Sequence, residues 1–354
     1  MSEDKSFSKA VFGPEAGDRV LLGIETSCDE TAAAVVLNGR KVLSSKLFSQ
    51  IQVHQEFGGV VPEVAARKHV EILNSIVEEA LSEAGVAPSD LSGIVCTAGP
   101  GLIGTLLVGL AAAKAYSWAW ERPFIAVDHL LSHVCANYID TDLEPPFVAL
   151  LVSGGHTQLL HFEDYRTSKI LGQTLDDAAG EAFDKVGRLL GLEYPGGPVI
   201  DQLALLGNAK AYAFPEGVVD GYDFSFSGLK TAVLRAVEKS LPPIPVADLA
   251  ASFQAAAVKV LVKKTLKAAH ELDVPRIVLA GGVAANRQLR AELTRQSSVP
   301  VYIPQLRYCT DNAAMVAAAG FYFNEASSYE VNAYSRQKHP KTLARRSKTA
   351  PAQR

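Results

Sequence analysis

Cysteine is scarce in this chain, and the few cysteines stand far apart. The 354 residues include four of them. They are Cys28, Cys96, Cys135 and Cys309. Because none of them forms a C-x-x-C pair, the pattern argues against a disulfide framework. It favours reduced thiols in a cytoplasmic protein.

Long apolar runs are also missing. The longest weakly polar run, 100–113, is too short to span a bilayer and is followed by Lys114. The first twenty residues carry acidic side chains and no apolar core, which argues against a secretory signal and an Arg-rich transit peptide. We therefore expect a cytoplasmic protein that is not inserted in a membrane.

Two common catalytic signatures are absent. No G-x-x-x-x-G-K-[ST] stretch occurs, so the chain is not predicted to be a P-loop nucleotide hydrolase. No His-Glu-x-x-His stretch occurs either, because the residues between His129 and His133 are Leu-Leu-Ser. A metalloprotease, in which that glutamate activates a zinc-bound water, is therefore disfavoured.

The composition is that of a folded protein with an uneven charge distribution. Hydrophobic residues make up 48% and charged residues 20%, and the net charge is −4. The length suggests two domains of ordinary size. The end of the chain, 335–354, carries seven Lys or Arg residues and no acid. We expect a disordered tail there, which either lies along a phosphate backbone or only adds solubility.

Two halves of the chain repeat the same order of elements. Each half begins with a predicted β-hairpin, at 20–37 and at 146–162, whose tip is polar or glycine-rich. Each half then continues to a strand, a glycine loop and a helix, at 93–120 and at 276–294. This predicts an α/β protein built from two duplicated lobes. The expected divisions are a tail at 1–19, a first lobe at 20–145, a second lobe at 146–325 and a basic tail at 326–354.

A pair of histidines follows the predicted strand 124–127. On a helix, His129 and His133 lie on one face about one turn apart, although this spacing also occurs on ordinary half-buried helices. Asp311 follows the equivalent strand of the second half, where we expect it at a helix N-terminus. Equivalent strand ends would face each other across the cleft. Two imidazoles and one carboxylate then form a three-ligand metal site with open positions, which is typical of catalytic sites.

The second half also carries an insertion, expected at about 171–230. Within it, Asp177, Glu181 and Asp184 are spaced to share one helical face, which is either functional or merely solvated. The stretch 194–198 is a predicted turn at which backbone can approach a ligand. The stretch 224–230 leads into another helix.

The glycine loops suggest nucleotide binding. A strand, a glycine turn and a helix N-terminus together cradle anionic groups. Gly154 and Gly155 expose backbone N–H groups, and Gly281–Gly282 with Asn286 offers a flat surface and an amide for a purine or a ribose. Each Gly-Gly pair alone is also an ordinary turn. Within a duplicated frame, the layout resembles actin-like, sugar-kinase-like and Hsp70-like proteins.

Several longer motifs are specific enough to indicate one family. They are Gly23–Thr31, His129–His133, Leu151–Thr157, Asp176–Lys185, Phe224–Lys230, Ala280–Val283 with Asn286, and Thr310–Asn312. Together they resemble the TsaD family of tRNA N6-adenosine threonylcarbamoyltransferases, and the resemblance extends from about Val20 to Phe323. It implies an actin-like ATPase (RNase H-like) fold with two lobes.

The resemblance implies a reaction and a site. The threonylcarbamoyl group of threonylcarbamoyl-AMP passes to the N6 amine of adenosine 37, next to the anticodon, in tRNAs that read codons beginning with A, and AMP leaves. One divalent metal ion per subunit, iron(II) in preference to zinc, is held by His129, His133 and Asp311. The implied substrate contacts are Leu151, Val152, Ser153, Gly154, Gly155, Asp184, Gly197, Asp201 and Asn286. Glu30, at the first hairpin tip, is a catalytic candidate without an assigned role.

The resemblance also implies partners and leaves alternatives. The expected partners are the tRNA anticodon stem-loop, a paralogue called TsaB and an ATPase called TsaE, with TsaC supplying the adenylate. One alternative is an actin-like nucleotide-binding protein without group transfer, which leaves the three metal ligands unexplained. Another is a carbamoyltransferase of the same fold whose acceptor is not tRNA.

Overall fold

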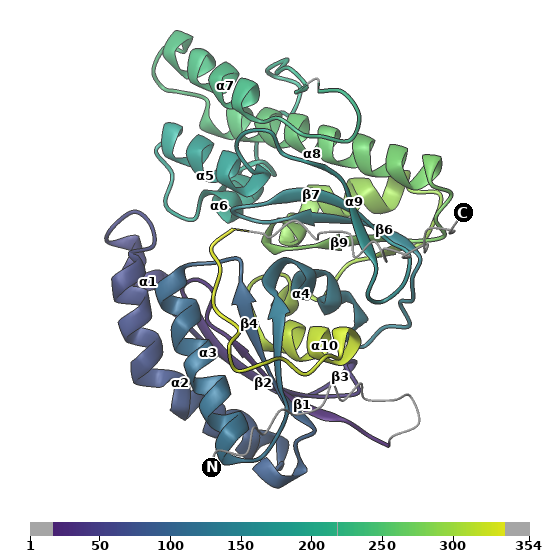
Figure 1. The fold of residues 1–354 in the computed structure, drawn as a ribbon. Helices are drawn as coiled ribbons and strands as arrows, with labels where there is room; N and C mark the ends of the chain where they lie inside the picture. The colour runs from purple at the N-terminus through teal and green to yellow at the C-terminus, as the bar shows by residue number, and fades with distance from the viewer. Residues whose placement is uncertain (1–16, 218, 337–354) are drawn as a thin grey trace, which may run out of the picture.

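The computed structural model describes residues 17–217 and 219–336. Two lobes stand one above the other, each containing one five-stranded mixed sheet (Figure 1). Most of the predicted basic tail, from 337 onward, lies outside the described residues. So does most of the tail expected at 1–19.

The first sheet has the strand order β3-β2-β1-β4-β5. Its strands are β1 (Val20–Glu25), β2 (Glu30–Leu37), β3 (Lys41–Ser49), β4 (Gly93–Gly99) and β5 (Phe124–Asp128). Strand β1 pairs antiparallel with β2 and parallel with β4. The predicted first hairpin is therefore confirmed, and its tip at residues 26–29 lies at the same sheet edge as the end of β4.

The second sheet repeats this order as β8-β7-β6-β9-β10. Strand β6 pairs antiparallel with β7 and parallel with β9, as β1 does with β2 and β4. Its strands are β6 (Phe147–Val152), β7 (Thr157–Phe162), β8 (Ser168–Gln173), β9 (Ile277–Ala280) and β10 (Val301–Tyr302). Every residue of β6 is buried, because helices cover both faces of this central strand. The matching orders of pairing confirm the predicted duplication.

The helices form three layers around the two sheets (Figure 1). Helices α1 (Ile51–Gln55), α2 (Pro62–Ala84) and α3 (Ile103–Ala119) belong to the first lobe. Helices α5 (Ala179–Leu189), α6 (Gly196–Leu203), α7 (Ser227–Lys239), α8 (Val246–Glu271) and α9 (Arg287–Gln296) belong to the second. Helices α4 (His129–Cys135) and α10 (Ala313–Phe323) lie between the sheets. One buried cluster joins side chains from both sheets to these two helices.

Helix α10 is apolar around its whole circumference, as a helix enclosed on all sides must be. It follows the last strand of the second sheet, yet it packs on strands β1 and β2 of the first. Gly23 of β1 allows this approach, since a Cβ there would lie 2.8 Å from the backbone nitrogen of Ala317. The crossing of α10 brings the end of the second half against the first sheet.

Three helices, α5 to α7, separate β8 from α8 and have no counterpart in the first half. Strand β8 occupies 168–173 and overlaps the start of the range expected for the insertion, at 171. Helix α7 continues to Lys239, beyond the expected end at 230. Of the predicted turn at 194–198, residues 194–195 form a bend and residues 196–198 begin α6.

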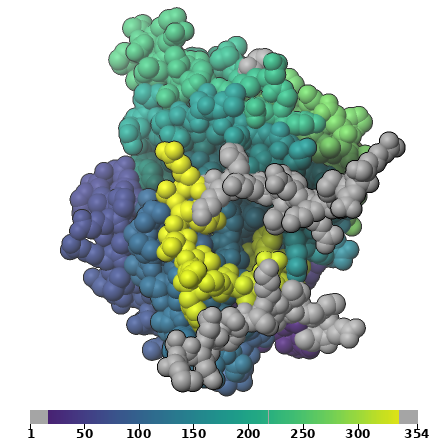
Figure 2. Space-filling model, in the orientation of Figure 1, coloured from purple at the N-terminus to yellow at the C-terminus, as the bar shows by residue number. Residues whose placement is uncertain are grey.

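The chain after α10 packs on the first lobe, although we expected residues from 326 onward to be a tail. Ser327 donates its backbone N–H to the carbonyl of Phe124, and its hydroxyl oxygen accepts from Ala126. Tyr334 donates its backbone N–H to Ala98. Figure 2 shows this yellow segment running over the face of the first lobe toward the second. Among the described helices, none is both long and apolar enough to cross a bilayer.

Candidate metal centre

Helix α4 presents two histidines at the junction of the lobes. Asp128 begins the helix by accepting hydrogen bonds from the backbone N–H groups of Leu130 and Leu131, at 2.8 and 3.1 Å. The helix starts directly after β5. His129 and His133 are four residues apart on it, so they lie one turn apart on the same face, with ring centroids separated by 4.7 Å. The predicted His-x-x-x-His helix is present.

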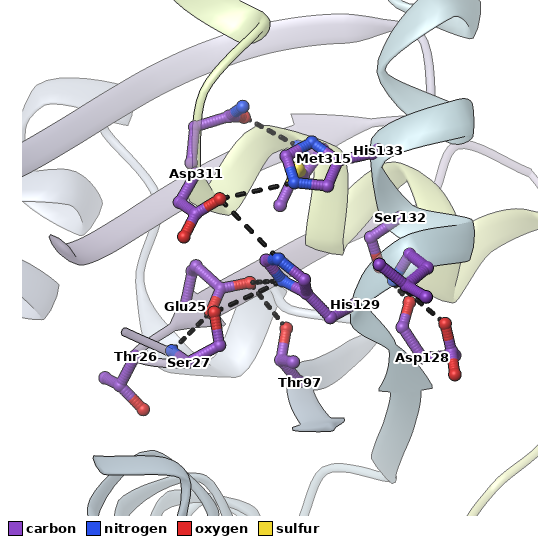
Figure 3. A network of polar contacts seen from close by, with 12 residues as sticks. Glu25, Thr26, Ser27, Thr97, Asp128, His129, Ser132, His133, Asp311 and Met315 are labelled. Atoms are coloured by element: carbon purple, nitrogen blue, oxygen red, sulfur yellow. Dashed lines mark hydrogen bonds and ion pairs between the residues drawn. The ribbon is translucent and has the colours of Figure 1, made fainter. Parts of the chain in front are cut away.

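Asp311 reaches the same place from the second half of the chain. Its Oδ1 lies 3.6 Å from Nε2 of His129 and 3.2 Å from Nε2 of His133 (Figure 3). The three ligand atoms lie within 4.8 Å of one another. Asp311 does not cap α10 as expected, because Asn312 caps it by accepting from the N–H of Met315. Relieved of capping, the carboxylate of Asp311 points to the histidines.

The charges of the three groups are strongly coupled. Burial disfavours the imidazolium of His129, but the carboxylates of Asp311 and Glu25 outweigh it and raise its pKa to about 9. Burial likewise opposes ionisation of Asp311, yet the two histidines lower its pKa to about 2. Two imidazole Nε2 atoms and one carboxylate are a donor set suited to iron(II) or zinc. A bound divalent cation would take the place of the imidazole protons.

Sequence reasoning missed a residue behind the triad. Glu25, the last residue of β1, is fully buried and lies 3.2 Å from Nδ1 of His129 (Figure 3). It also accepts a hydrogen bond from the hydroxyl of Thr97. The available signal was an acid at the end of an otherwise apolar strand.

A pocket of about 570 Å³ adjoins the triad in the second lobe. Thr310, which precedes the candidate ligand Asp311, lines the pocket. Five of the predicted substrate contacts line the pocket together: Gly154, Asp184, Gly197, Asp201 and Asn286. The structure thus collects residues from the β6–β7 tip, the insertion and the start of α9 around one space.

Four other predicted contacts do not line it. Leu151 and Val152 are fully buried in strand β6, and their side chains belong to the cores on the two sides of the sheet. Ser153 and Gly155 lie at the β6–β7 tip, beside Gly154. At Gly154 and Gly155 a Cβ would meet nothing within 4 Å, so the backbone there is open to a ligand.

Three helices begin at this pocket. Its lining includes residues from the first turns of α5, α6 and α9, among them Gly180, Gly197 and Arg287. The dipoles of helix N-termini, together with those first-turn N–H groups that do not donate to protein atoms, favour an anion such as a phosphate. Gly180 is needed for this packing, since a Cβ there would lie 2.5 Å from the carbonyl oxygen of Ser153.

The polar side chains of the pocket are already partly engaged. Asp184 accepts from the N–H of Gly196 at 2.8 Å, and burial raises its pKa. Asp201 pairs with Arg287 at 3.1 Å. Asn286 caps α9, and its amide nitrogen donates to Gln254. These contacts hold the pocket walls in place and leave each side chain with reduced capacity for a ligand.

Not all of the predicted acidic face exists. Asp177 precedes helix α5, and its carboxylate binds the ammonium groups of Lys185 and Lys230. Asp176 accepts from Ser225 and from the N–H of Phe226. These two acids connect the helices of the insertion and do not line the pocket.

Glu30 begins strand β2 and is half-buried. Burial, together with repulsion by Asp29 and Asp311, raises its pKa to about 7. The hydrogen bond from Ser49 acts in the opposite direction and lowers the pKa, but its effect is smaller than that of burial. Its Oε2 is buried without a hydrogen-bond partner among the described residues. The two lobes also touch nearby, since the carbonyl of Tyr194, just before α6, accepts a hydrogen bond from the side chain of Gln55 in α1 at 3.1 Å.

The fold and the site together define a class. The chain is a two-lobed protein of the actin-like ATPase fold, with a two-histidine, one-carboxylate triad where the lobes meet. Comparison with known families also assigns the chain to a particular family within this class. It belongs to the TsaD family of tRNA N6-adenosine threonylcarbamoyltransferases, whose family model matches residues 41–318.

Similar proteins support both statements. A tRNA N6-adenosine threonylcarbamoyltransferase of Caldicellulosiruptor saccharolyticus is 51% identical over 89% of this chain and 96% of its own length. A tRNA N6-adenosine threonylcarbamoyltransferase of Bacillus subtilis is 50% identical over 86% of this chain and 91% of its own length.

Solved structures share the fold at low identity. HypF of T. kodakarensis has a TM-score of 0.60 at 15% identity, covering 88% of this chain and 48% of its own. Component A of (R)-2-hydroxyglutaryl-CoA dehydratase from Acidaminococcus fermentans has a TM-score of 0.51 at 14% identity. The match covers 86% of this chain and 98% of that one. At these identities the similarity concerns the fold alone.

Proposed function

We propose that the triad and the adjoining pocket form the site at which this chain, a tRNA N6-adenosine threonylcarbamoyltransferase by family, carries out its reaction. The threonylcarbamoyl group of threonylcarbamoyl-AMP is transferred to the N6 amine of adenosine 37, and AMP is released. One observation carries the proposal: His129, His133 and Asp311 converge beside a cavity of about 570 Å³ at which three helices begin.

The pocket is the proposed site for the adenylate. Its walls combine helix N-termini, which favour the phosphate, with open glycine backbone at Gly154 and Gly282 against which a flat base can lie. Asp184 and Asp201 would accept hydrogen bonds from ribose or threonyl hydroxyls through the carboxylate lone pairs that their contacts with Gly196, Gln254 and Arg287 leave unused. Backbone N–H groups of the β6–β7 tip would hold phosphate or carbonyl oxygens in fixed positions.

The triad is the proposed site of one divalent cation per subunit, iron(II) in preference to zinc. The two-histidine, one-carboxylate donor set supports iron(II), which commonly takes it. A cation held there would neutralise charge on the leaving phosphate. The chain's own contribution is to fix both imidazoles on α4 and the carboxylate of Asp311 from the opposite half.

The acceptor amine needs help from neighbouring groups. An exocyclic aromatic amine is a weak nucleophile, and its base must leave the anticodon-loop stack at a cost of a few kcal/mol. Glu30, whose pKa of about 7 lies near neutral pH, is suited to accept the proton that the amine loses. We propose it as the general base.

Partners and location follow from the family and are part of the proposal. We infer cooperation with TsaB and TsaE, supply of the adenylate by TsaC, binding of a tRNA anticodon stem-loop, and a cytoplasmic location. The basic end of the chain after Tyr334 would add phosphate contacts.

Reconstitution tests the proposal. Full-length protein, the three partner proteins, threonine, bicarbonate, ATP and unmodified tRNA should yield the modified nucleoside after digestion. His129→Ala should lose bound metal and transfer, and a far-UV spectrum should show an intact fold. His161→Ala, a partly exposed histidine on β7, is the matched control and should keep both. Absence of product with active partners would refute the transfer, and full metal content in His129→Ala would refute the site.

A further inference from the structure

Glu25 is an acid in a place where acids are rare. It ends strand β1, and its exposed fraction is 0%. A fully buried carboxylate is strongly unfavourable unless a cation and hydrogen-bond donors compensate for its lost hydration. Its partners therefore indicate why it is there.

Three donors surround the carboxylate. Oε1 accepts from the backbone N–H of Ser27 at 2.6 Å, and Oε2 accepts from the hydroxyl of Thr97 at 2.7 Å. Nδ1 of His129 lies 3.2 Å from Oε2 (Figure 3). Within the described part of the chain, His129 is its only ion-pair partner. Ser27 and Thr97 hold the carboxylate from two sides and aim Oε2 at the imidazole.

This contact determines which nitrogen of His129 carries a proton. A carboxylate can only accept, so Nδ1 must donate. The hydroxyl of Ser27, also 3.2 Å from Nδ1, can donate or accept and does not select a tautomer. With the proton on Nδ1, the lone pair of a neutral ring is on Nε2, which faces Asp311.

We propose that Glu25 is a positioning residue for the metal centre, whose carboxylate holds the ring and the tautomer of His129 so that Nε2 binds the metal ion. The inference rests on the proposed metal site. Partners of this kind behind a ligating histidine strengthen metal binding about 10- to 100-fold. His133 has no such partner, since its Nδ1 is buried without one among the described residues. The orienting effect is therefore specific to His129.

A purely structural role is the competing explanation. Through Ser27, Glu25 also holds the β1–β2 turn. Glu25→Gln separates the two roles, because glutamine keeps the size and an oxygen to accept from Ser27. It presents an amide group, itself a donor, toward Nδ1 of His129. Nδ1 must then accept, and its proton moves to Nε2, where it blocks metal binding.

The experiment measures Zn²⁺ affinity of full-length, metal-stripped protein by competition with a chromophoric chelator. We expect Glu25→Gln to bind Zn²⁺ about 10- to 100-fold more weakly than wild type. The visible spectrum of the Co²⁺-loaded variant should change, which a structural role would not cause. Ser27→Ala keeps the carboxylate and the backbone N–H that holds it, so it should lose less than about tenfold in affinity. In a His129→Ala background, Glu25→Gln should have no further effect.

The outcomes distinguish a failure of the positioning role of Glu25 from a failure of the proposed metal site. Equal Zn²⁺ affinity of wild type and His129→Ala would refute the metal site itself. If His129→Ala binds weakly but Glu25→Gln binds like wild type, the site stands and the positioning role is refuted. The positioning role is also refuted if Glu25→Gln still weakens Zn²⁺ binding in the His129→Ala background. It is refuted as well if Ser27→Ala weakens Zn²⁺ binding as much as Glu25→Gln does. Thermal unfolding of the metal-free proteins identifies a variant that is merely misfolded.

Discussion

Gly180→Ala tests the packing that shapes the pocket. The added Cβ would lie 2.5 Å from the carbonyl oxygen of Ser153 and 2.8 Å from Cα of Gly154. Both are backbone atoms, so no side-chain rotation relieves the overlap. Overpacking of this kind costs about 1–3 kcal/mol. Alanine gains about 1 kcal/mol over glycine in a helix interior, so in the first turn of α5 it returns at most that amount. The free energy of unfolding should therefore fall by only about 0–2 kcal/mol.

The effect on transfer should be larger than the effect on stability. Ordinary contact begins at 3.4 Å, so α5 and the β6–β7 tip must separate by roughly 0.9 Å to relieve the contact with Ser153. Misplacement of groups around a substrate by about 1 Å costs about 100-fold in rate. We expect kcat/KM for formation of the modified nucleoside to fall by about that factor.

Urea unfolding and nucleoside analysis by chromatography measure the two effects. Gly228→Ala is the matched control, because it adds the same methyl group to helix α7 with nothing within 4 Å. It should keep the wild-type rate and gain up to about 1 kcal/mol. A Gly180→Ala enzyme with wild-type kcat/KM would contradict the reasoning.

Two further predictions concern other parts of the site. Tyr334→Phe removes the hydroxyl that donates to Asp128 at 2.9 Å, and the free energy of unfolding should fall by about 1.5–3 kcal/mol; an unchanged urea midpoint would contradict this. Glu30 has its pKa raised from 4.5 to about 7, so between these values the folded state binds a proton that the unfolded state has lost, and stability falls as pH rises. In metal-free protein, Glu30→Gln should remove this slope, so its stability relative to wild type should increase from pH 4.5 to 7. A constant difference across that range would refute the assigned pKa.

Local patterns in the sequence were enough to identify the three candidate metal ligands. The spacing of His129 and His133 places them on one helical face whatever the partner, and the repeated order of elements relates Asp311 to them across the lobes. These inferences needed only helix periodicity and the duplication. The structure brings the three residues together as expected.

Other predictions failed because they depended on neighbours. The spacing of Asp177 suggested a shared helical face with Glu181, but Lys185 and Lys230 hold Asp177 outside the helix. Asn312 follows Asp311 and takes the capping role, which residue type alone could not decide because both side chains cap well. Longer-range contacts chose between local options of similar energy.

The amino-acid sequence by itself determined the two-lobed α/β architecture, the identity of the metal-ligand candidates and the family, since each is encoded in local periodicity or in an uninterrupted motif. Only the tertiary structure decided that α10 crosses to the first sheet, that three helices begin at one pocket and that Glu25 stands behind His129. Those arrangements depend on which surfaces pack together and on how a buried charge is compensated. Both are properties of residues far apart in the chain, so no local pattern records them.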